Sequence, residues 1–251
     1  MQVFKIPDSM KKGFKYTFCP GCDHGIAVRL VAELLDEMNL KEKSILVASI
    51  GCSVFLYDFL DVDSIEAPHG RAMAEATGVK RARPDKFVFT YQGDGDFASI
   101  GLAESTHAAL RGENLSGICI NNTTYGMTGG QHGPTTLIGQ KTTTSPMGRF
   151  AETYGYPIKI AEHIALCKGT AYSARVALDT VAHINQAKKA LKKAFQVQLD
   201  GLGYGFVEIL STCPTNWKMT PDQAHERVKN EMIPEFPLGV FKDVTENIDK
   251  V

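Results

Sequence analysis

The sequence predicts an α/β fold in which a mostly parallel sheet is covered by helices on both faces, and three observations support this prediction. Short runs of β-branched and aromatic residues alternate with segments of helical apolar spacing. The chain has 251 residues, 43% hydrophobic and 22% charged, which is enough to bury the core of one large domain. Glycine, aspartate, asparagine and cysteine gather directly after the predicted strands, where ligands bind in open α/β sheets.

The first half of the chain contains two predicted helices, each followed by a predicted strand. Residues 23–38 read as a helix, because the leucines fall on one face and Asp23 suits the N-cap position. The apolar run 44–50 (SILVASI) is typical of a buried strand. Residues 72–81 predict the second helix and residues 86–92 (KFVFTYQ) the second strand.

The second half continues the alternation but contains one long irregular segment. Residues 97–110 predict a helix and residues 117–120 a strand. Gly, Thr, Pro and Gln dominate residues 123–146 without any apolar period, and a loop of this length inside a domain is usually functional or disordered. A basic amphipathic helix is predicted over residues 179–198, and a last strand over residues 205–210.

We predict a single domain over residues 1–233, because the sequence contains no internal repeat and no low-complexity linker. Residues 234–251 carry Pro234, Pro237 and mixed charge, and we interpret them as a C-terminal arm.

The charge balance argues against two classes of partner. The chain has 27 Lys and Arg against 28 Asp and Glu, a formal charge of -1, so neither nucleic acid nor an anionic membrane surface is expected to bind. The apolar stretch 44–57 is shorter than the roughly 20 residues of a transmembrane helix. The first residues show no secretory signal, and we therefore expect a cytoplasmic protein.

Two polar motifs follow neighbouring predicted strands and together indicate a magnesium–diphosphate site. Alone, the Gly-Asp-Gly motif at 93–95 is more often a tight turn. Asp94 and Asn122 can supply two hard oxygen ligands to Mg²⁺, and a backbone carbonyl near Thr124 and two phosphate oxygens can add three more. The pairing of Gly-Asp-Gly with Asn-Asn at 121–122, each after a strand, matches the thiamine diphosphate signature.

The six cysteines occupy positions 19, 22, 52, 119, 167 and 213. A disulfide framework is not expected in a cytoplasmic chain of this length. The CPGC segment at 19–22 leaves three interpretations open: a redox pair, half of a zinc site near His24, or half of a [4Fe–4S] site. The last requires two more thiolates, and Cys52 and Cys213 follow strands at the same predicted sheet edge. The remaining two cysteines are expected to be small buried hydrophobes.

Three further segments lie at this predicted rim. An isolated histidine such as His69 is more often a packed or capping residue, but its position favours contact with a phosphate or substrate. Gly51 allows the backbone of residues 50–53 to approach a ligand closely. Backbone N–H groups of residues 125–128 are suited to receive a diphosphate.

Taken in order, these residues resemble the β (thiamine diphosphate-binding) subunits of 2-oxoacid:ferredoxin oxidoreductases. The segments that carry the resemblance are CPGC at 19–22, IGCS at 50–53, HGRA at 69–72, ATGVKRARP at 76–84, GDGDFASIG at 93–101, NNTTYGMTGGQHGPT at 121–135 and CP at 213–214. The resemblance spans most of the chain up to about residue 220, and the ordered set is far more specific than any one piece.

The resemblance implies a thiamine diphosphate-binding fold and assigns site residues. Mg²⁺ would be held by Asp94, Asn122 and the carbonyl of Thr124. The residues implied to bind or line the thiamine diphosphate site are Ile50, Gly51, Cys52, Ser53, His69, Gly95, Asp96, Gly126 and Met127. The [4Fe–4S] cluster would be held by Cys19, Cys22, Cys52 and Cys213. His69 is the candidate catalytic residue.

The resemblance also implies a reaction and partners. The expected activity is coenzyme A-dependent oxidative decarboxylation of a 2-oxoacid, with electrons passed through the cluster to ferredoxin. The expected partners are an α subunit that carries the aminopyrimidine-binding domain and the activating glutamate, and possible further subunits such as a γ chain. A hetero-oligomer is therefore expected.

The substrate class is predicted from one apolar segment. Phe55 lies three residues after Cys52, and residues 44–57 offer no cation to meet a second carboxylate. Because burying an unpaired carboxylate costs several kcal/mol, we predict Phe55 as a substrate contact and a branched-chain 2-oxoacid such as 2-oxoisovalerate as substrate; 2-oxoglutarate and pyruvate are the alternatives. A different class, a non-catalytic iron–sulfur electron-transfer module, is disfavoured by the intact Asp94 and Asn122.

Overall fold

The computed structural model describes residues 5–245, and its strands form one seven-stranded sheet in the order β2-β1-β3-β4-β6-β5-β7. The strands are β1 (Ser44–Ala48), β2 (Asp63–Glu66), β3 (Phe87–Gly93), β4 (Ser116–Asn121), β5 (Thr170–Ala177), β6 (Tyr204–Leu210) and β7 (Gly239–Asp243). The first six are mutually parallel, and β7 pairs antiparallel with β5. The predicted mostly parallel sheet is confirmed.

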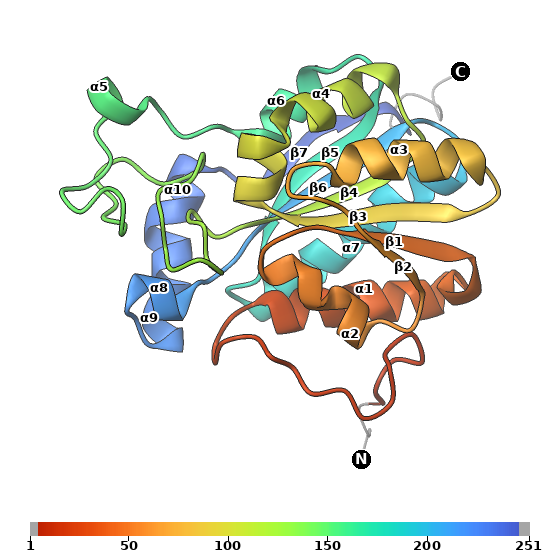
Figure 1. Cartoon of the computed structure of the whole chain (residues 1–251), viewed down its shortest axis with the longest axis horizontal. Helices are drawn as coiled ribbons and strands as arrows, with labels where there is room; N and C mark the ends of the chain where they lie inside the picture. The colour runs from red at the N-terminus through yellow and green to blue at the C-terminus, as the bar shows by residue number, and fades with distance from the viewer. Residues whose placement is uncertain (1–4, 246–251) are drawn as a thin grey trace.

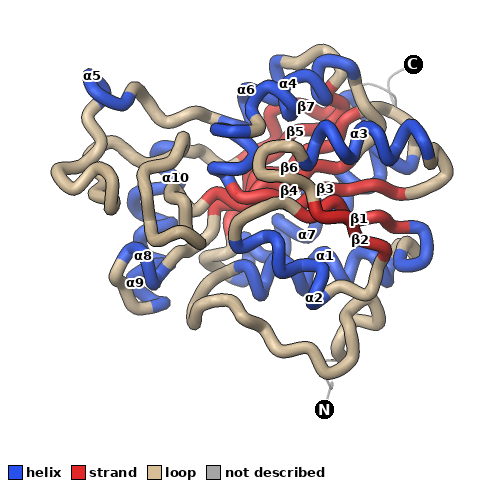
Figure 2. The backbone as a smooth tube through the Cα atoms, in the orientation of Figure 1, coloured by secondary structure: helices blue, strands red, loops and turns tan. Residues whose placement is uncertain are grey.

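Helices cover both faces of this sheet, as the sequence predicts (Figures 1 and 2). One face carries α1 (His24–Glu37), α2 (Leu56–Phe59) and α7 (Val181–Leu199), and the other carries α3 (Ala72–Ala82), α4 (Leu102–Arg111) and α6 (Ile160–Leu166). Each face has its own apolar core. The rings of Phe87, Phe89 and Phe195 pack together in the first core, and those of Phe97, Tyr204 and Phe206 in the second.

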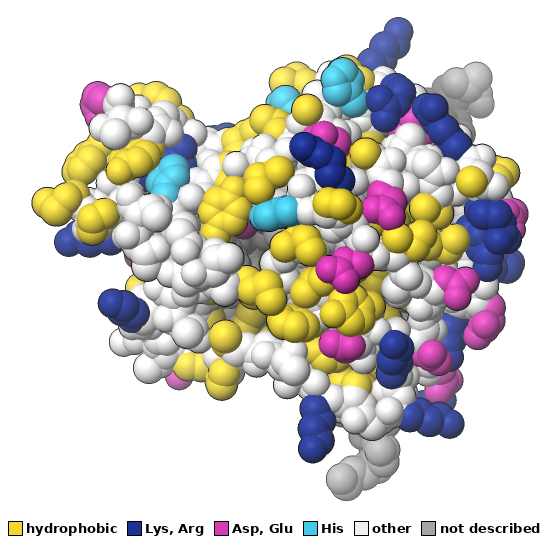
Figure 3. Space-filling model, viewed as in Figure 1, with side chains coloured by type: hydrophobic (Ala, Val, Ile, Leu, Met, Phe, Trp, Pro, Cys, Tyr) yellow, Lys and Arg dark blue, Asp and Glu magenta, His cyan; other side chains and the backbone are white. Residues whose placement is uncertain are grey.

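A smaller lobe lies beyond the carboxyl ends of the strands, on the left of Figure 1. It contains α5 (Ala151–Tyr154), α8 (Pro214–Trp217), α9 (Pro221–Arg227), α10 (Ile233–Glu235) and the long loop that follows β4. A small core under this lobe includes Leu137, Leu210 and Phe236. In Figure 3 the lobe carries hydrophobic side chains on its surface, and the exposed ones include Ile138, Met147, Phe150, Tyr154 and Tyr156.

Short non-α turns complete the fold. The 3₁₀ segments are η1 (Lys41–Lys43) and η2 (Cys52–Phe55), and the π-helical segments are η3 (Asp96–Ile100) and η4 (Val228–Met232). The helix predicted over residues 97–110 is therefore two elements, because Gly101 separates η3 from α4. Within residues 5–245, no helix is long and apolar enough to cross a membrane.

Two local expectations differ from the structure. Asp23 stands at the N-cap of α1, but its side chain makes no capping bond. Its carboxylate instead accepts the backbone N–H of Thr212 at 2.9 Å and contacts His225 Nε2 at 3.0 Å. It thereby joins the start of α1 to the segment after β6 and to α9. Within the predicted C-terminal arm, the structure forms β7 at the sheet edge, and residues 246–251 lie outside the described range.

Candidate active site

The motifs found in the sequence meet at one edge of the sheet because their strands are parallel neighbours. β1, β3, β4 and β6 lie side by side in the sheet, and Gly51-Cys52, Gly93-Asp94, Asn121-Asn122 and Cys213 stand at or just after their carboxyl ends. His69 follows the neighbouring strand β2, and the CPGC segment precedes α1. In the register, Gly93 aligns with Ile120 and Asn121 aligns with Leu210, so these strands end at nearly the same level. The turns after them therefore form a common rim.

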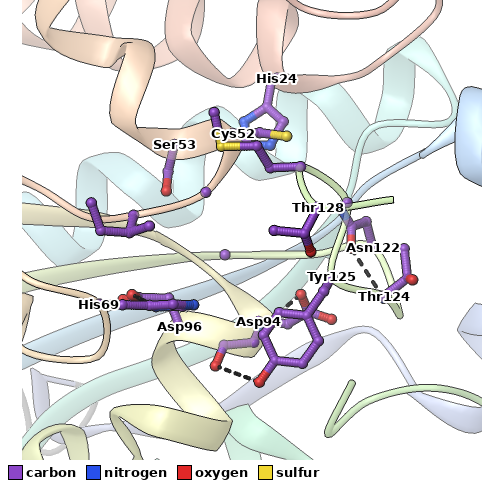
Figure 4. A pocket seen from close by; sticks show the side chains of 16 residues that line it. His24, Cys52, Ser53, His69, Asp94, Asp96, Asn122, Thr124, Tyr125 and Thr128 are labelled. Carbon is purple, nitrogen blue, oxygen red and sulfur yellow. Dashed lines mark hydrogen bonds and ion pairs between the residues drawn. The ribbon is translucent and has the colours of Figure 1, made fainter. Parts of the chain in front are cut away.

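Every residue predicted for the magnesium and thiamine diphosphate site lines a single pocket at this rim. Figure 4 shows His69 and Asp96 on one side, Asn122 and Thr124 on the other, and Asp94 between them. Glycine is required where the chain segments come closest. A Cβ on Gly95 would lie 2.3 Å from the ring of Tyr125, so any side chain there would force that ring out of its position in the pocket wall.

Asp94 is one of two buried acids that line this pocket, and within residues 5–245 it has no cationic partner. Its carboxylate accepts the N–H of Gly95 at 2.9 Å and the hydroxyl of Thr135. Among residues 5–245, no Lys, Arg or His forms an ion pair with it. Burial raises the pKa of Asp94 to about 7, and the charge of Glu208 acts in the same direction. A hard divalent cation would supply the missing positive charge, and carboxylate, amide and carbonyl oxygens are suitable ligands for Mg²⁺.

The two asparagines of the Asn-Asn motif have different environments. Asn121 turns into the sheet, where its Nδ2 donates to Glu208 Oε1 at 2.7 Å. Asn122 lines the pocket, and its Oδ1 accepts the N–H of Thr124 at 3.1 Å (Figure 4). Thr123, which lies between Asn122 and Thr124, has a φ of 60°, a left-handed conformation that reverses the direction of the chain at the pocket. Asn122 and Thr124 therefore lie on the same side of the pocket, opposite His69.

His69 is oriented by a buried acid. Its Nδ1 bonds to Asp96, whose carboxylate also accepts the N–H of Gly70 at 2.7 Å and Nε2 of Gln92 at 2.6 Å. The carboxylate of Asp96 is therefore hydrogen-bonded to three protein groups, and its role at the pocket is to orient the imidazole of His69. The ring of Tyr125 stands edge-on to His69, with centroids 6.3 Å apart. His69 is the less buried partner and faces the cavity.

A second pocket adjoins the first and brings four cysteines together. Cys19, Cys22, Cys52 and Cys213 all line it, and Cys52 lines both pockets. Cys19 is exposed and the other three are partly buried. Burial raises the pKa of Cys22 to about 12 and that of Cys52 to about 11, so without a metal these thiols stay protonated at neutral pH.

The other two cysteines are buried elsewhere, Cys119 in β4 and Cys167 at the end of α6, as the sequence predicts. In the described part of the chain, no three His, Cys, Asp or Glu side chains are grouped so that they could hold one metal ion. The four cysteines that share a pocket instead surround a space, and four thiolates are the usual donor set of an iron–sulfur cluster.

Phe55 lies in the cysteine pocket and not in the pocket around Asp94. Its ring stands edge-on to Phe18, with centroids 6.4 Å apart, and it packs against the first core. Phe55 therefore lies beside the four cysteines. Its spacing of three residues from Cys52 is compatible with either pocket, because Cys52 lines both.

Several site residues were not found by sequence reasoning because their contacts are long-range. Thr135 reaches Asp94 from the long loop, and Asn216 reaches Cys213 and Gly126 from α8. His24, considered only as a zinc ligand, lines both pockets and contacts the hydroxyl of Tyr91 at 2.9 Å through Nδ1. Its proximity to the CPGC segment was the one available signal.

Comparisons with known proteins agree with this geometry. Residues 49–209 match the family model described as thiamine pyrophosphate enzyme, C-terminal TPP binding domain. Ketoisovalerate oxidoreductase subunit VorA of Methanothermobacter thermautotrophicus is 42% identical over 96% of this chain and 53% of its own length. The 2-oxoglutarate synthase subunit KorB of Methanocaldococcus jannaschii is 42% identical over 80% of this chain and 70% of its own.

A solved structure is similar over nearly the whole chain. The 2-oxoglutarate:ferredoxin oxidoreductase from Magnetococcus marinus superposes with a TM-score of 0.76 at 25% identity, covering 98% of this chain and 89% of that one. The chain spans about half the length of the ketoisovalerate relatives it matches.

Proposed function

Because the chain belongs to the thiamine pyrophosphate enzymes and, among them, to the subunits of 2-oxoacid:ferredoxin oxidoreductases, we propose that it catalyses oxidative decarboxylation of a 2-oxoacid within such a complex. The observation that carries the proposal is the pair of adjoining pockets. One holds a buried acid without a cation, and the other holds four cysteines. Residues 1–233 would form one domain that binds both groups.

The first pocket suits thiamine diphosphate and Mg²⁺. Asp94, Asn122 and the carbonyl of Thr124 would hold the metal ion, and the backbone around Gly95 and Gly126 would receive the diphosphate. When bound, thiamine diphosphate supplies the electron sink for loss of carbon dioxide. His69, held by Asp96 through Nδ1, would exchange a proton with the substrate at Nε2.

The second pocket suits a [4Fe–4S] cluster held by Cys19, Cys22, Cys52 and Cys213. Cys52 belongs to both pockets, so the cluster would lie directly beside the cofactor that loses electrons. The exposed Cys19 marks the side from which an electron acceptor such as ferredoxin would be reached. Coenzyme A would accept the acyl group.

A partner subunit is part of the proposal. Thiamine diphosphate is held between two domains in the family that the sequence resembles, and the chain carries the diphosphate-binding one. The lobe beside the pocket exposes Met147, Phe150 and Tyr156, an apolar surface next to the site (Figure 3). An α subunit with the aminopyrimidine-binding domain would complete the site, and a γ chain is a further candidate.

We infer a branched-chain 2-oxoacid such as 2-oxoisovalerate as the preferred substrate. Two ketoisovalerate relatives are 42% and 43% identical over 96% of this chain, whereas the 2-oxoglutarate relative of comparable identity aligns with 80%. The test compares kcat/KM for 2-oxoisovalerate, pyruvate and 2-oxoglutarate on the reconstituted complex. A tenfold preference for 2-oxoglutarate, about 1.4 kcal/mol, would contradict this inference.

The experiment on the function itself measures what the purified chain binds. The full chain, prepared without oxygen, should contain iron and sulfide and should bind thiamine diphosphate in the presence of Mg²⁺. Cys213→Ser should lose iron, because a hydroxyl is a poor replacement for a thiolate, whereas Cys167→Ser, in a buried position away from the pocket, should keep it. Stoichiometric zinc without iron would overturn the cluster assignment. Iron without cofactor binding, even after an α subunit of the family is added, would favour an electron-transfer module.

A further inference from the structure

Asn216 makes two hydrogen bonds that neither motif nor fold accounts for. It lies on α8, three residues after Cys213, and its Nδ2 is 3.2 Å from Cys213 Sγ and 2.8 Å from the carbonyl oxygen of Gly126. A side-chain amide nitrogen carries two protons, so it can donate to both acceptors at once.

These two acceptors lie where the two pockets adjoin. Cys213 lines the cysteine pocket, and Gly126 belongs to the loop that forms one wall of both pockets. The loop is packed closely around the amide. A Cβ on Gly130 would lie 3.1 Å from Asn216 Cβ, and a Cβ on Gly126 would lie 3.6 Å from both Asn216 Nδ2 and Cys213 Sγ. Asn216 is therefore a short bridge between the two sites.

The segment that carries Asn216 is held in place on both sides. The N–H of Trp217 donates to the carbonyl of Cys213 at 3.0 Å, and Pro214 occupies the first turn of α8. The guanidinium of Arg227 lies 4.3 Å over the Trp217 ring. The amide thus meets the sulfur of Cys213 from a fixed direction, with Nδ2 at 3.2 Å.

We propose that Asn216 is a positioning residue that raises the reduction potential of the cluster through its bond to Cys213 and holds the cofactor loop through its bond to Gly126. The inference rests on the proposed function, because it takes Cys213 as a cluster ligand. Hydrogen bonds to the sulfurs stabilise the reduced, more negative cluster, and partners of ligands also affect affinity. One side chain would therefore couple electron acceptance to cofactor binding.

The test uses the full chain, purified without oxygen, and three variants. Asn216→Leu keeps the approximate size of the side chain and removes both donors. Asn216→Ala also removes both donors, adds no charge and is too small to press on the neighbouring loop. Asn230→Leu is the matched control, because Asn230 is exposed and bonds only to Glu226 within residues 5–245. The readouts are iron content, the cluster's potential by redox titration with electron paramagnetic resonance, and thiamine diphosphate affinity.

We expect Asn216→Leu to retain iron, to show a more negative cluster potential and to bind thiamine diphosphate roughly tenfold more weakly. The control should match the wild type in all three. An iron-loaded Asn216→Leu protein with an unchanged potential would overturn the inference while leaving the proposed function intact. If Asn216→Leu loses its iron, the potential of Asn216→Ala decides in the same way. A wild-type chain without any cluster would overturn both.

Discussion

Two buried carboxylates of the same sheet have opposite surroundings. Glu208 on β6 accepts Nε of Arg175 at 2.9 Å, the N–H of Ala161 at 3.0 Å and Nδ2 of Asn121 at 2.7 Å. Arg175 is itself fully buried and also pairs with Glu162. Asp94, equally buried, has one hydroxyl and one backbone N–H as donors and no cation within the described chain.

The difference separates a structural acid from a ligand-binding acid. A buried charge with a complete set of partners costs little to keep, and removing one partner is expensive. A buried charge without a cation destabilises the protein that carries it, and such groups cluster at functional sites. The Glu208 network faces the interior of the sheet, whereas Asp94 faces a pocket. The contrast supports the proposal that Mg²⁺ balances the charge of Asp94.

The largest effect on stability is expected from a substitution in the hydrogen-bonded network around Glu208. Glu208→Ala removes the fully buried one of the two carboxylate partners of Arg175 and leaves the amide of Asn121 without its acceptor. The free energy of unfolding should fall by about 3–5 kcal/mol, measured by urea denaturation. The control is Glu226→Ala at an exposed position. A loss below about 1 kcal/mol would mean that the network does not stabilise the fold, and the comparison would fail.

Asp94→Asn should have opposite effects on binding and stability. Binding of thiamine diphosphate with Mg²⁺ should weaken at least 100-fold, about 2.7 kcal/mol, by titration calorimetry. The apoprotein should become more stable at alkaline pH, on the order of 2–4 kcal/mol, because the variant buries no charge.

The pH dependence gives the sign of that stability effect. The pKa of Asp94 is raised in the folded state to about 7, so its unfavourable contribution is absent below the ordinary value of 3.8 and grows as the pH rises toward 7. The stability difference between Asp94→Asn and wild-type apoprotein should therefore widen from acid to alkaline pH. Equal stability at every pH would show that Asp94 is solvated or paired, contrary to the comparison.

The smallest effect is expected at an intermediate case, Asp23. This buried acid contacts His225, and the pKa of His225 is raised, chiefly by that bond. A raised histidine pKa stabilises the fold below its ordinary value of 6.5, and the contribution is lost as the pH rises through the folded-state pKa. Because His225 is partly exposed, the loss in His225→Asn should stay below about 1 kcal/mol and appear only at acid pH. A pH-independent loss would point to packing instead.

The sequence predicts those strands that are buried and therefore consist of a continuous run of apolar residues. The apolar segments at 44–50, 86–92 and 205–210 correspond to β1, β3 and β6. β5 was not predicted, because its TAYSARVA segment carries Arg175, and the burial of that arginine depends on Glu208 and Glu162 from other elements.

The same distinction holds for the site. Residues in ordered motifs, such as Asp94 and Asn122, were predicted and meet in one pocket. Thr135 and Asn216 were not singled out as site residues, because each acts through contacts with distant segments that no local pattern encodes. β2 was missed for a different reason: it is a short, exposed edge strand without apolar alternation.

The strand order also determines when the pockets can exist during folding. Their walls come from segments between Thr17 and Asn216, and β6 takes its place beside β4 only after the chain has passed through β5 and α7. Pairings between such distant segments form slowly, because the chain loses loop-closure entropy before it gains the stabilising contacts. A ligand at this rim can therefore bind only to a chain that has completed its sheet. Under the proposed function, the binding energy of the cofactor would add to the stability of that state alone, so the fraction of folded chains would rise with cofactor concentration.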